Sequence, residues 1–190
     1  MKGAIAVYRK LICALLLALL ACAEVRAAGI ALTAVGQSPD AVMVNVILKK
    51  QKIAADYNAM MQETDLTEQK VLIAVVGGSS KGLGAAGIDR NQELTRGIAL
   101  INAAKAKGLK TLVMHVGGEG RRGELSDAFI AGIVPLADAL IIVKGANADG
   151  FFDKLKPASI VMVEANGIQT VGGDLAVVLK EWGVAGQAQP

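Results

Sequence analysis

From residue 30 onward, short apolar runs alternate with segments of helical periodicity. Continuous apolar runs at 30–35, 71–76, 111–116, 139–143 and 160–163 predict strands that are covered on both faces, as in a parallel sheet. Helical periodicity predicts helices at 39–50, 89–107, 126–133, 149–155 and 171–182. This alternation predicts an α/β fold, a three-layer α/β/α sandwich with a five- or six-stranded, mostly parallel sheet in a flavodoxin- or Rossmann-like order.

Residues at the segment ends refine these predictions. Ser38 and Pro39 fit the N-cap and first position of a helix, and Asp89-x-x-Gln92 has the spacing of a capping box. Residues 53–60 fit either the tail of the first helix or a short edge strand. We favour the edge strand, because a parallel sheet needs a crossover there. We expect the glycine-rich residues 82–87 to separate Ser80 from the helix that Asp89 begins.

The first 23 residues have the pattern of a signal peptide. A basic start precedes an apolar run at 11–21, which is too short to span a bilayer comfortably. Cleavage is expected after Ala23 or as late as residue 28, and the residues before Cys22 also resemble a lipoprotein signal. A buried N-terminal helix or anchor is the alternative. We therefore expect an extracytoplasmic protein that is periplasmic, secreted or lipid-anchored, with one domain at 29–184 and a tail at 185–190.

Removal of this leader changes the charge balance. The chain has 20 basic and 17 acidic residues, and cleavage after Ala23 would take away three basic residues and no acid. With 3% aromatic residues, nothing indicates a nucleic-acid surface. Both cysteines, Cys13 and Cys22, lie in the leader, so the expected mature domain has no disulfide and no thiol chemistry. Contact with a membrane is expected only through a lipid anchor at Cys22.

Polar and glycine-rich loops follow the predicted strands, whereas the loops at the opposite edge are short and plain. The carboxyl ends of parallel strands share one edge of the sheet, and ligands bind there, near the point where the strand order reverses. Glycines let backbone N–H groups approach a ligand, and Lys81, Arg121 and Arg122 add positive charge. The pattern favours a small anion, although a solvated turn explains the same cations.

His115, the only histidine, ends a predicted strand at this edge. It fits a ligand contact, an acid or base, or a satisfied structural group. No second histidine and no cysteine is available beside it to complete a nitrogen and sulfur metal site, so no metal is expected, and nothing in the sequence calls for a cofactor. An all-oxygen Mg²⁺ or Ca²⁺ site at Asp40, Asp89 and Glu119 is an alternative that nothing specific in the sequence supports.

The stretch Gly78-Ser79-Ser80-Lys81-Gly82-Leu83-Gly84 matches parts of several enzyme motifs. A dehydrogenase would need the loop after the first strand and a downstream Tyr-x-x-x-Lys, and both are missing. A phosphate loop needs Ser or Thr after the lysine, which Gly82 replaces. The elbow of a serine hydrolase fits better, because Ser80 follows a strand and His115 comes later. However, the expected glycine spacer and the position of His115 weaken this interpretation.

Four loops together resemble an uncharacterised group of secreted bacterial proteins, known as a domain of unknown function. They are GQSPDA, VVGGSSKGLGAAGID, HVGGEGRRGELSD and NADGFF, and the resemblance covers residues 30–165. It implies an exported Rossmann-like domain with no assigned activity. The marked residues that it implies are Gln37, Ser38, Asp40, Ser79, Ser80, Lys81, Asp89, His115, Arg121 and Arg122.

The sequence thus predicts an exported protein that binds a small anionic metabolite at the carboxyl edge of its sheet, with those ten residues as ligand contacts. A partner chain or a second copy would supply a second wall of the site. One alternative is an extracytoplasmic serine hydrolase or transferase that uses Ser80 and His115. Another is a scaffold whose glycine loops dock a protein.

Overall fold

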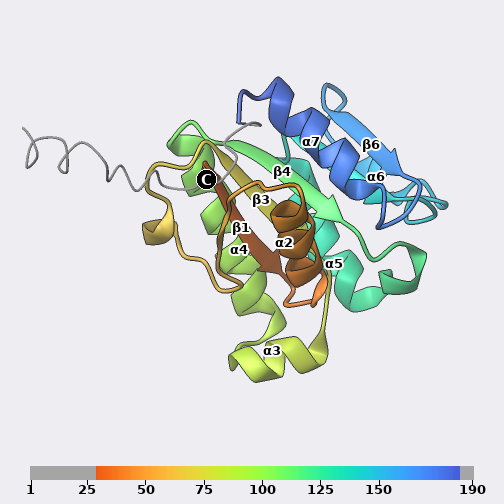
Figure 1. The fold of residues 1–190 in the computed structure, drawn as a ribbon. Helices are drawn as coiled ribbons and strands as arrows, with labels where there is room; N and C mark the ends of the chain where they lie inside the picture. The colour runs from red at the N-terminus through yellow and green to blue at the C-terminus, as the bar shows by residue number, and fades with distance from the viewer. Residues whose placement is uncertain (1–28, 185–190) are drawn as a thin grey trace, which may run out of the picture.

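Six parallel strands form the central sheet of the computed structural model, which describes residues 29–184 (Figure 1). Their spatial order is β2-β1-β3-β4-β5-β6, the flavodoxin-like order expected from the sequence. The strands are β1 (Ile30–Val35), β2 (Asp56–Tyr57), β3 (Val71–Val76), β4 (Lys110–His115), β5 (Ala139–Val143) and β6 (Val161–Ala165). The helices are α2 (Asp40–Lys50), α3 (Ser80–Ala86), α4 (Arg90–Ala106), α5 (Glu124–Ile133), α6 (Phe151–Leu155) and α7 (Val171–Glu181).

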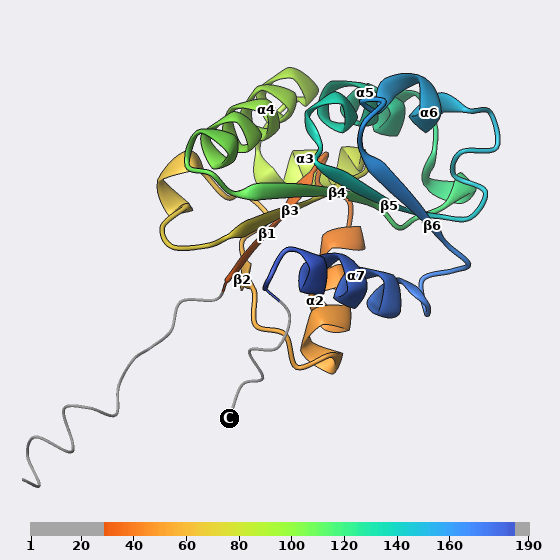
Figure 2. The same ribbon diagram turned by 90° about the horizontal axis from the view of Figure 1, so that it is seen from above.

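The strand order reverses at β1. This strand pairs with β2 on one side and with β3 on the other, in parallel register from Ile30 opposite Val71 to Val35 opposite Val76. The chain leaves β1 through α2 toward one face of the sheet and leaves β3 through α3 and α4 toward the other (Figure 2). The ends of β1 and β3 therefore frame the switch point at which ligands bind in such sheets.

Helices cover both faces of the sheet, so the strands are apolar on both sides. α2 and α7 pack on one face with the core residues Val44, Leu48 and Leu175. α4, α5 and α6 pack on the other, where Phe129 and Phe152 are fully buried. This arrangement confirms the expected three-layer α/β/α sandwich, and residues 56–57 form the edge strand that the sequence favoured.

Residues 80–86 form helix α3, and here our sequence expectation of a glycine spacer was wrong. Ser79 is the N-cap, and its Oγ accepts a hydrogen bond from Gly82 N at 3.0 Å. Leu83 packs into the core, and Gly87 ends the helix in the left-handed conformation. A cap, a buried leucine and a C-terminal glycine together outweigh the low helix propensity of the glycines inside.

Other helix starts differ from the prediction by one or two residues, and two of these involve a serine. Pro39, not Ser38, occupies the N-cap position of α2, and Ser38 Oγ accepts a hydrogen bond from Asp40 N at 3.3 Å. Helix α5 begins at Glu124, and Ser126 inside it accepts a hydrogen bond from Gly78 N at 2.9 Å. In both cases the serine contacts backbone at the edge of the sheet.

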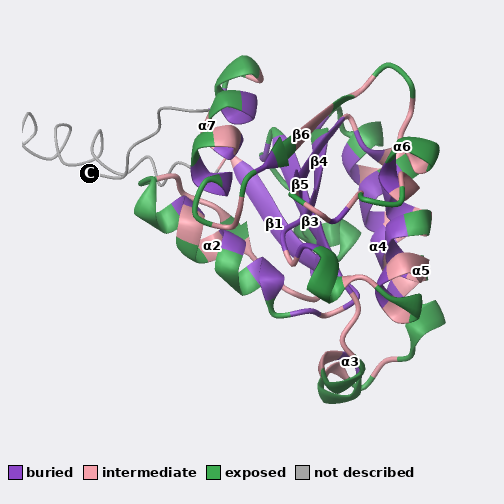
Figure 3. Ribbon diagram, turned by 90° about the vertical axis from the view of Figure 1, so that its right-hand side faces the viewer, coloured by how far each residue is buried: buried purple, intermediate pink, exposed green. Residues whose placement is uncertain are grey.

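Burial follows the layers: the central strands β1, β3, β4 and β5 are largely buried, whereas the edge strands and the outer faces of the helices are partly exposed (Figure 3). α3 stands away from the rest of the molecule and is largely exposed. Within residues 29–184, no helix is long and apolar enough to cross a membrane. The expected signal peptide, its cleavage points, Cys22 and the tail at 185–190 lie outside the described residues.

Candidate functional site

The loops after β1 and β3 are joined backbone to backbone at the carboxyl edge of the sheet. Ser38 N donates to Gly77 O at 3.1 Å, and Ser79 N donates to Gly36 O at 2.8 Å. Gly36 has a φ of 97°, and a Cβ on it would lie 2.5 Å from Gly77 O. Glycine is needed there because any side chain would push the two loops apart. The two joined loops form the floor of the switch point.

Gln37 is held inside this floor rather than directed at a ligand. Its φ is 58°, a left-handed conformation that is uncommon for residues other than glycine. Its side-chain Nε2 donates to Glu93 Oε1 at 2.9 Å and to Ala59 O at 3.1 Å. Both amide hydrogens are therefore used within the protein.

A buried ion pair below the loop, which our sequence analysis missed, fixes this geometry. Glu93 is fully buried, and its Oε1 also accepts from Gly36 N at 2.9 Å. Arg96 binds both carboxylate oxygens, through Nε at 2.7 Å and Nη2 at 2.8 Å. It also donates to Met61 O and Ala34 O. The i, i+3 spacing of Glu93 and Arg96 was visible in the sequence, but it is equally typical of an exposed helix pair.

Asp40 is a buried carboxylate at this edge that lacks a hydrogen-bond donor. It lies at the first position of α2 and is 7% exposed. Among residues 29–184, its Oδ2 is the one buried side-chain nitrogen or oxygen atom with no hydrogen-bond partner. A Cβ on Gly77 would lie 3.4 Å from this atom, and a Cβ on Gly117 would lie 3.0 Å from it. The oxygen thus faces two glycines at the ends of β3 and β4, where side chains are excluded.

Arg121 lies next to the Asp40 carboxylate. It ends the 3-10 turn Glu119–Arg121, and its Nε is 4.0 Å from Asp40 Oδ1. Its stem passes so close to Gly117 that a Cβ there would overlap it. The side chain is 48% exposed, and its guanidinium makes no hydrogen bond with any of residues 29–184. Its donors are available to an anion.

The neighbouring Arg122 has no donor left for a ligand. Nε donates to Asp127 Oδ1 at 2.6 Å, and the two terminal nitrogens donate to Asp127, Asp149 and Ala146 O. The guanidinium also lies 4.6 Å above the centre of the Phe151 ring. The hydrogen bond with Asp127 raises the pKa of Arg122, and the hydrogen bond from Arg122 lowers the pKa of Asp149. Arg122 joins the loop after β4 to the loop after β5.

His115 is fully buried, and both of its ring nitrogens face backbone carbonyls. Nδ1 is 3.0 Å from Val76 O, and Nε2 is 3.1 Å from Gly118 O. Its ring also packs at 5.7 Å from that of Phe152. A neutral imidazole has one N–H and satisfies one of these carbonyls, whereas an imidazolium satisfies both. Neither nitrogen is directed at a serine, so this geometry does not support a Ser80–His115 catalytic pair.

The remaining predicted residues have local roles or face solvent. Ser79 caps α3, while Ser80 and Lys81 are exposed in its first turn. Asp89 caps α4 in the predicted capping box, because Gln92 N donates to Asp89 Oδ1 at 2.8 Å and Asp89 N donates to Gln92 Oε1 at 2.9 Å. The structure therefore brings Ser38, Asp40 and Arg121 together at the switch point and assigns structural contacts to Gln37, Ser79, Asp89, His115 and Arg122.

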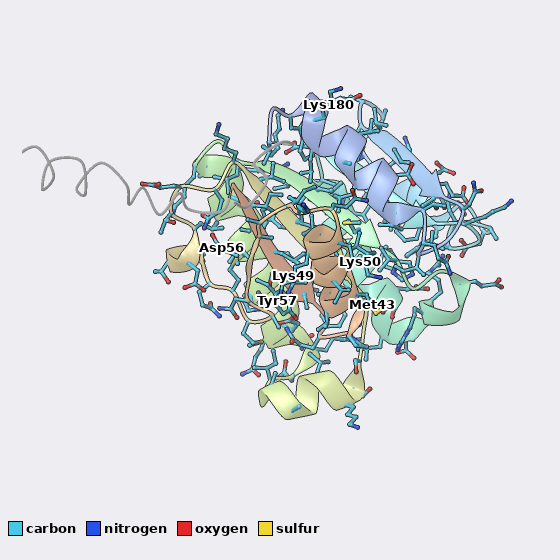
Figure 4. All side chains as sticks on the ribbon, in the orientation of Figure 1. Met43, Lys49, Lys50, Asp56, Tyr57 and Lys180 are labelled. Carbon is cyan, nitrogen blue, oxygen red and sulfur yellow. The ribbon has the colours of Figure 1, made fainter. Side chains whose placement is uncertain are left out.

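Two hollows lie elsewhere on the surface. One, of about 280 Å³, is lined by Met43, Val46 and Lys50 of α2 and by Ile168 and Gly172 at the start of α7. Met43 and Lys50 are labelled in Figure 4. The other, of about 550 Å³, lies between Gln62 and α4. Neither hollow includes Asp40 or Arg121. We place the candidate site at Asp40 and Arg121 because these charged side chains lie at the switch point and have donors or acceptors without hydrogen-bond partners among the described residues. Neither hollow has both properties.

No group of three or more His, Cys, Asp or Glu within residues 29–184 could hold a metal ion. No curated protein matches the chain, and no solved structure matches it. A family model described as "Domain of unknown function (DUF6305)" matches residues 27–179, a longer span than the loops whose resemblance suggested such a family. The chain therefore belongs to this family, DUF6305.

Proposed function

We propose that this protein binds a small ligand with an anionic group, and that Arg121 holds that group at the carboxyl edge of the sheet. The observation that carries the proposal is the guanidinium of Arg121. It lies at the switch point, makes no hydrogen bond with the other described residues and is half exposed. A planar guanidinium offers paired donors to a carboxylate or phosphoryl group.

The surroundings of Arg121 support this role. The floor made by the loops after β1 and β3 is fixed by Glu93 and by the contacts between Gly36 and Gly77, so the site needs little ordering on binding. Helix α2 begins at this floor, and its N-terminus adds a partial positive charge. A scaffold role lacks a comparable observation. A hydrolase role also lacks one: although α3 begins at Ser80, both ring nitrogens of His115 face backbone carbonyls instead of this serine.

A thermal-shift screen of the full chain against acetate, propionate, succinate, inorganic phosphate, the common amino acids and phosphoethanolamine tests the proposal. A ligand at about 100 times its Kd stabilises the folded state by about 2.7 kcal/mol, which raises Tm by several degrees in a chain of this size. Arg121→Ala should abolish the shift. Arg90→Ala, which removes an exposed arginine at the first position of α4, should keep it. A shift that survives Arg121→Ala, or no shift with any compound, would refute the proposal.

We further propose that the protein acts outside the cytoplasm, on the strength of the leader pattern in its first 23 residues. The mass of the mature chain after expression in a bacterium tests this. Cleavage after Ala23 leaves Glu24 as the first residue, whereas lipidation leaves a modified Cys22. A mass that still contains all of residues 1–23 would contradict export.

A further inference from the structure

The candidate site carries two opposite charges in one place. Arg121 Nε lies 4.0 Å from Asp40 Oδ1, and no other cation lies within 4.0 Å of this carboxylate in residues 29–184. The Asp40 side chain is nine-tenths buried, and its Oδ2 has no hydrogen-bond partner among these residues. Ser38 accepts a hydrogen bond from Asp40 N through its Oγ, and its hydroxyl does not donate to the Asp40 carboxylate. Gly77 and Gly117, which flank Oδ2, have no side chains to offer.

A ligand that were only an anion would fit this site poorly. It would pair with Arg121 and draw the guanidinium away from Asp40. The buried carboxylate would then lose the one cation near it and would also face a second negative charge. A carboxylate that is nine-tenths buried is costly to leave without a compensating charge, although Arg121 itself is half exposed. A ligand that brings its own positive group to Asp40 avoids this cost.

We infer that the ligand is a small zwitterion, with an anionic group that binds Arg121 and an ammonium group that binds Asp40. An α-amino acid or a phosphorylated amine has this chemistry. Its two charges match those of the site, so binding leaves neither the carboxylate nor the guanidinium unpaired. An ammonium group also supplies the donor that Asp40 Oδ2 lacks. This inference rests on the proposed function, since it assumes that Arg121 binds the anionic group.

Arg121 controls access to Asp40 in this arrangement. Its stem lies across Gly117 and covers the carboxylate, while its half-exposed end can move into solvent. A ligand that draws the guanidinium outward would therefore also uncover the carboxylate. The absence of a side chain at Gly117 leaves room for the arginine stem beside Asp40.

Binding measurements on the full chain test the inference. The probes are the common L-α-amino acids and phosphoethanolamine as zwitterions, with propionate, succinate and ethyl phosphate as anions and ethylamine as a cation. We expect at least one zwitterion to bind at least about tenfold more tightly than every singly charged probe, because a charge-assisted hydrogen bond is lost with either group. Asp40→Asn should weaken the binding of that zwitterion at least about tenfold. Glu124→Gln is the matched control, since Glu124 is an exposed acid at the first position of α5 at the same edge, and it should change nothing.

Each contrary result has a distinct meaning. Anions that bind as tightly as zwitterions, or more tightly to Asp40→Asn, would overturn the inference and leave the proposed function standing. Binding of Mg²⁺ or Ca²⁺ that requires Asp40 would overturn it in favour of a cation site. Zwitterion binding unchanged in Asp40→Asn would mean that Asp40 only stabilises the start of α2, and this also overturns it. No binding of any probe would overturn both proposals. The comparison of probes on the wild-type chain decides the question even where Asp40→Asn fails to fold.

Discussion

The side-chain amide of Gln37 donates a hydrogen bond of 2.9 Å to the buried carboxylate of Glu93. Gln37 lies in the loop after β1, and Glu93 lies in the first turn of α4, which follows β3 and α3 in the chain. This contact therefore joins the connections that leave the two strands at the switch point. It holds Gln37 in its left-handed conformation, and the loop above it forms the floor of the candidate site.

Glu93→Gln should destabilise the fold strongly, because it leaves Arg96 buried without its counter-charge. Both side chains are at least nine-tenths buried, so the expected loss is about 3–5 kcal/mol in the free energy of unfolding. Urea unfolding followed by circular dichroism measures it. The exposed Glu124 provides the control: Glu124→Gln should change stability by less than about 0.5 kcal/mol. A loss below about 1 kcal/mol for Glu93→Gln would contradict a structural role for the pair.

Two glycines in α3 should respond oppositely to the same substitution. A Cβ on Gly82 would overlap the carbonyl oxygen of Gln37, whereas nothing lies within 4 Å of a Cβ on Gly84. Gly82→Ala should therefore lower stability by about 1–3 kcal/mol. Gly84→Ala should raise it by about 0.5–1 kcal/mol, because alanine loses less backbone entropy in a helix. Thermal unfolding of both variants is the measurement, and equal shifts in one direction would refute the contact between α3 and Gln37.

Arg122→Lys should loosen the contact between the loops after β4 and β5. Lysine keeps the charge but has three donors on one nitrogen, whereas Arg122 uses five donors spread over a planar fork to bind Asp127, Asp149 and the Ala146 carbonyl. We expect a loss of about 1–3 kcal/mol, with no loss of ligand binding beyond that caused by destabilisation. Arg121→Lys is the matched control and should leave stability nearly unchanged, since Arg121 is half exposed. If Arg122→Lys were as stable as the wild type, this would contradict the role of Arg122 in joining the loops after β4 and β5.

Low pH should weaken the interaction between Arg122 and Asp149, which is one part of this contact between the loops. The hydrogen bond from Arg122 holds the pKa of Asp149 below its ordinary value of 3.8. A carboxyl whose pKa is lower in the folded state adds stability above its unfolded value, and this stability disappears as the pH falls through the folded value. The difference in Tm between the wild type and Asp149→Asn should therefore be constant above about pH 5 and shrink below about pH 4. A difference that grows toward low pH would have the wrong sign.

Much of the fold could be predicted because the strands are continuous apolar runs. The predicted bounds of 30–35, 71–76 and 139–143 match β1, β3 and β5. Burial on both faces leaves these segments few alternatives to a central strand. Helix α3 could not be predicted, because its two internal glycines argue against a helix, and the reason for Gly82 is a carbonyl from a loop more than 40 residues earlier.

The site was predictable as a location but not in its details. The location of the site at the carboxyl edge follows from the order of the strands. By contrast, the different roles of Arg121 and Arg122 depend on which acids of other elements contact each arginine. Asp127 and Asp149 approach Arg122 from separate elements, and nothing in the sequence around the two arginines distinguishes them. Likewise, Glu93 and Arg96 look like an ordinary surface pair until the packing of α4 places them under the loop.

Helix α3 projects from the body of the protein, and among its residues only Leu83 is buried. Its two glycines weaken its backbone, so it is a weakly held helix. Its amide hydrogens should exchange with deuterium long before those of α4, which follows it directly in the chain. A protease should also cut here first. The segment whose glycines resemble an enzyme's phosphate loop should thus open locally more readily than the joined loops after β1 and β3 beside it.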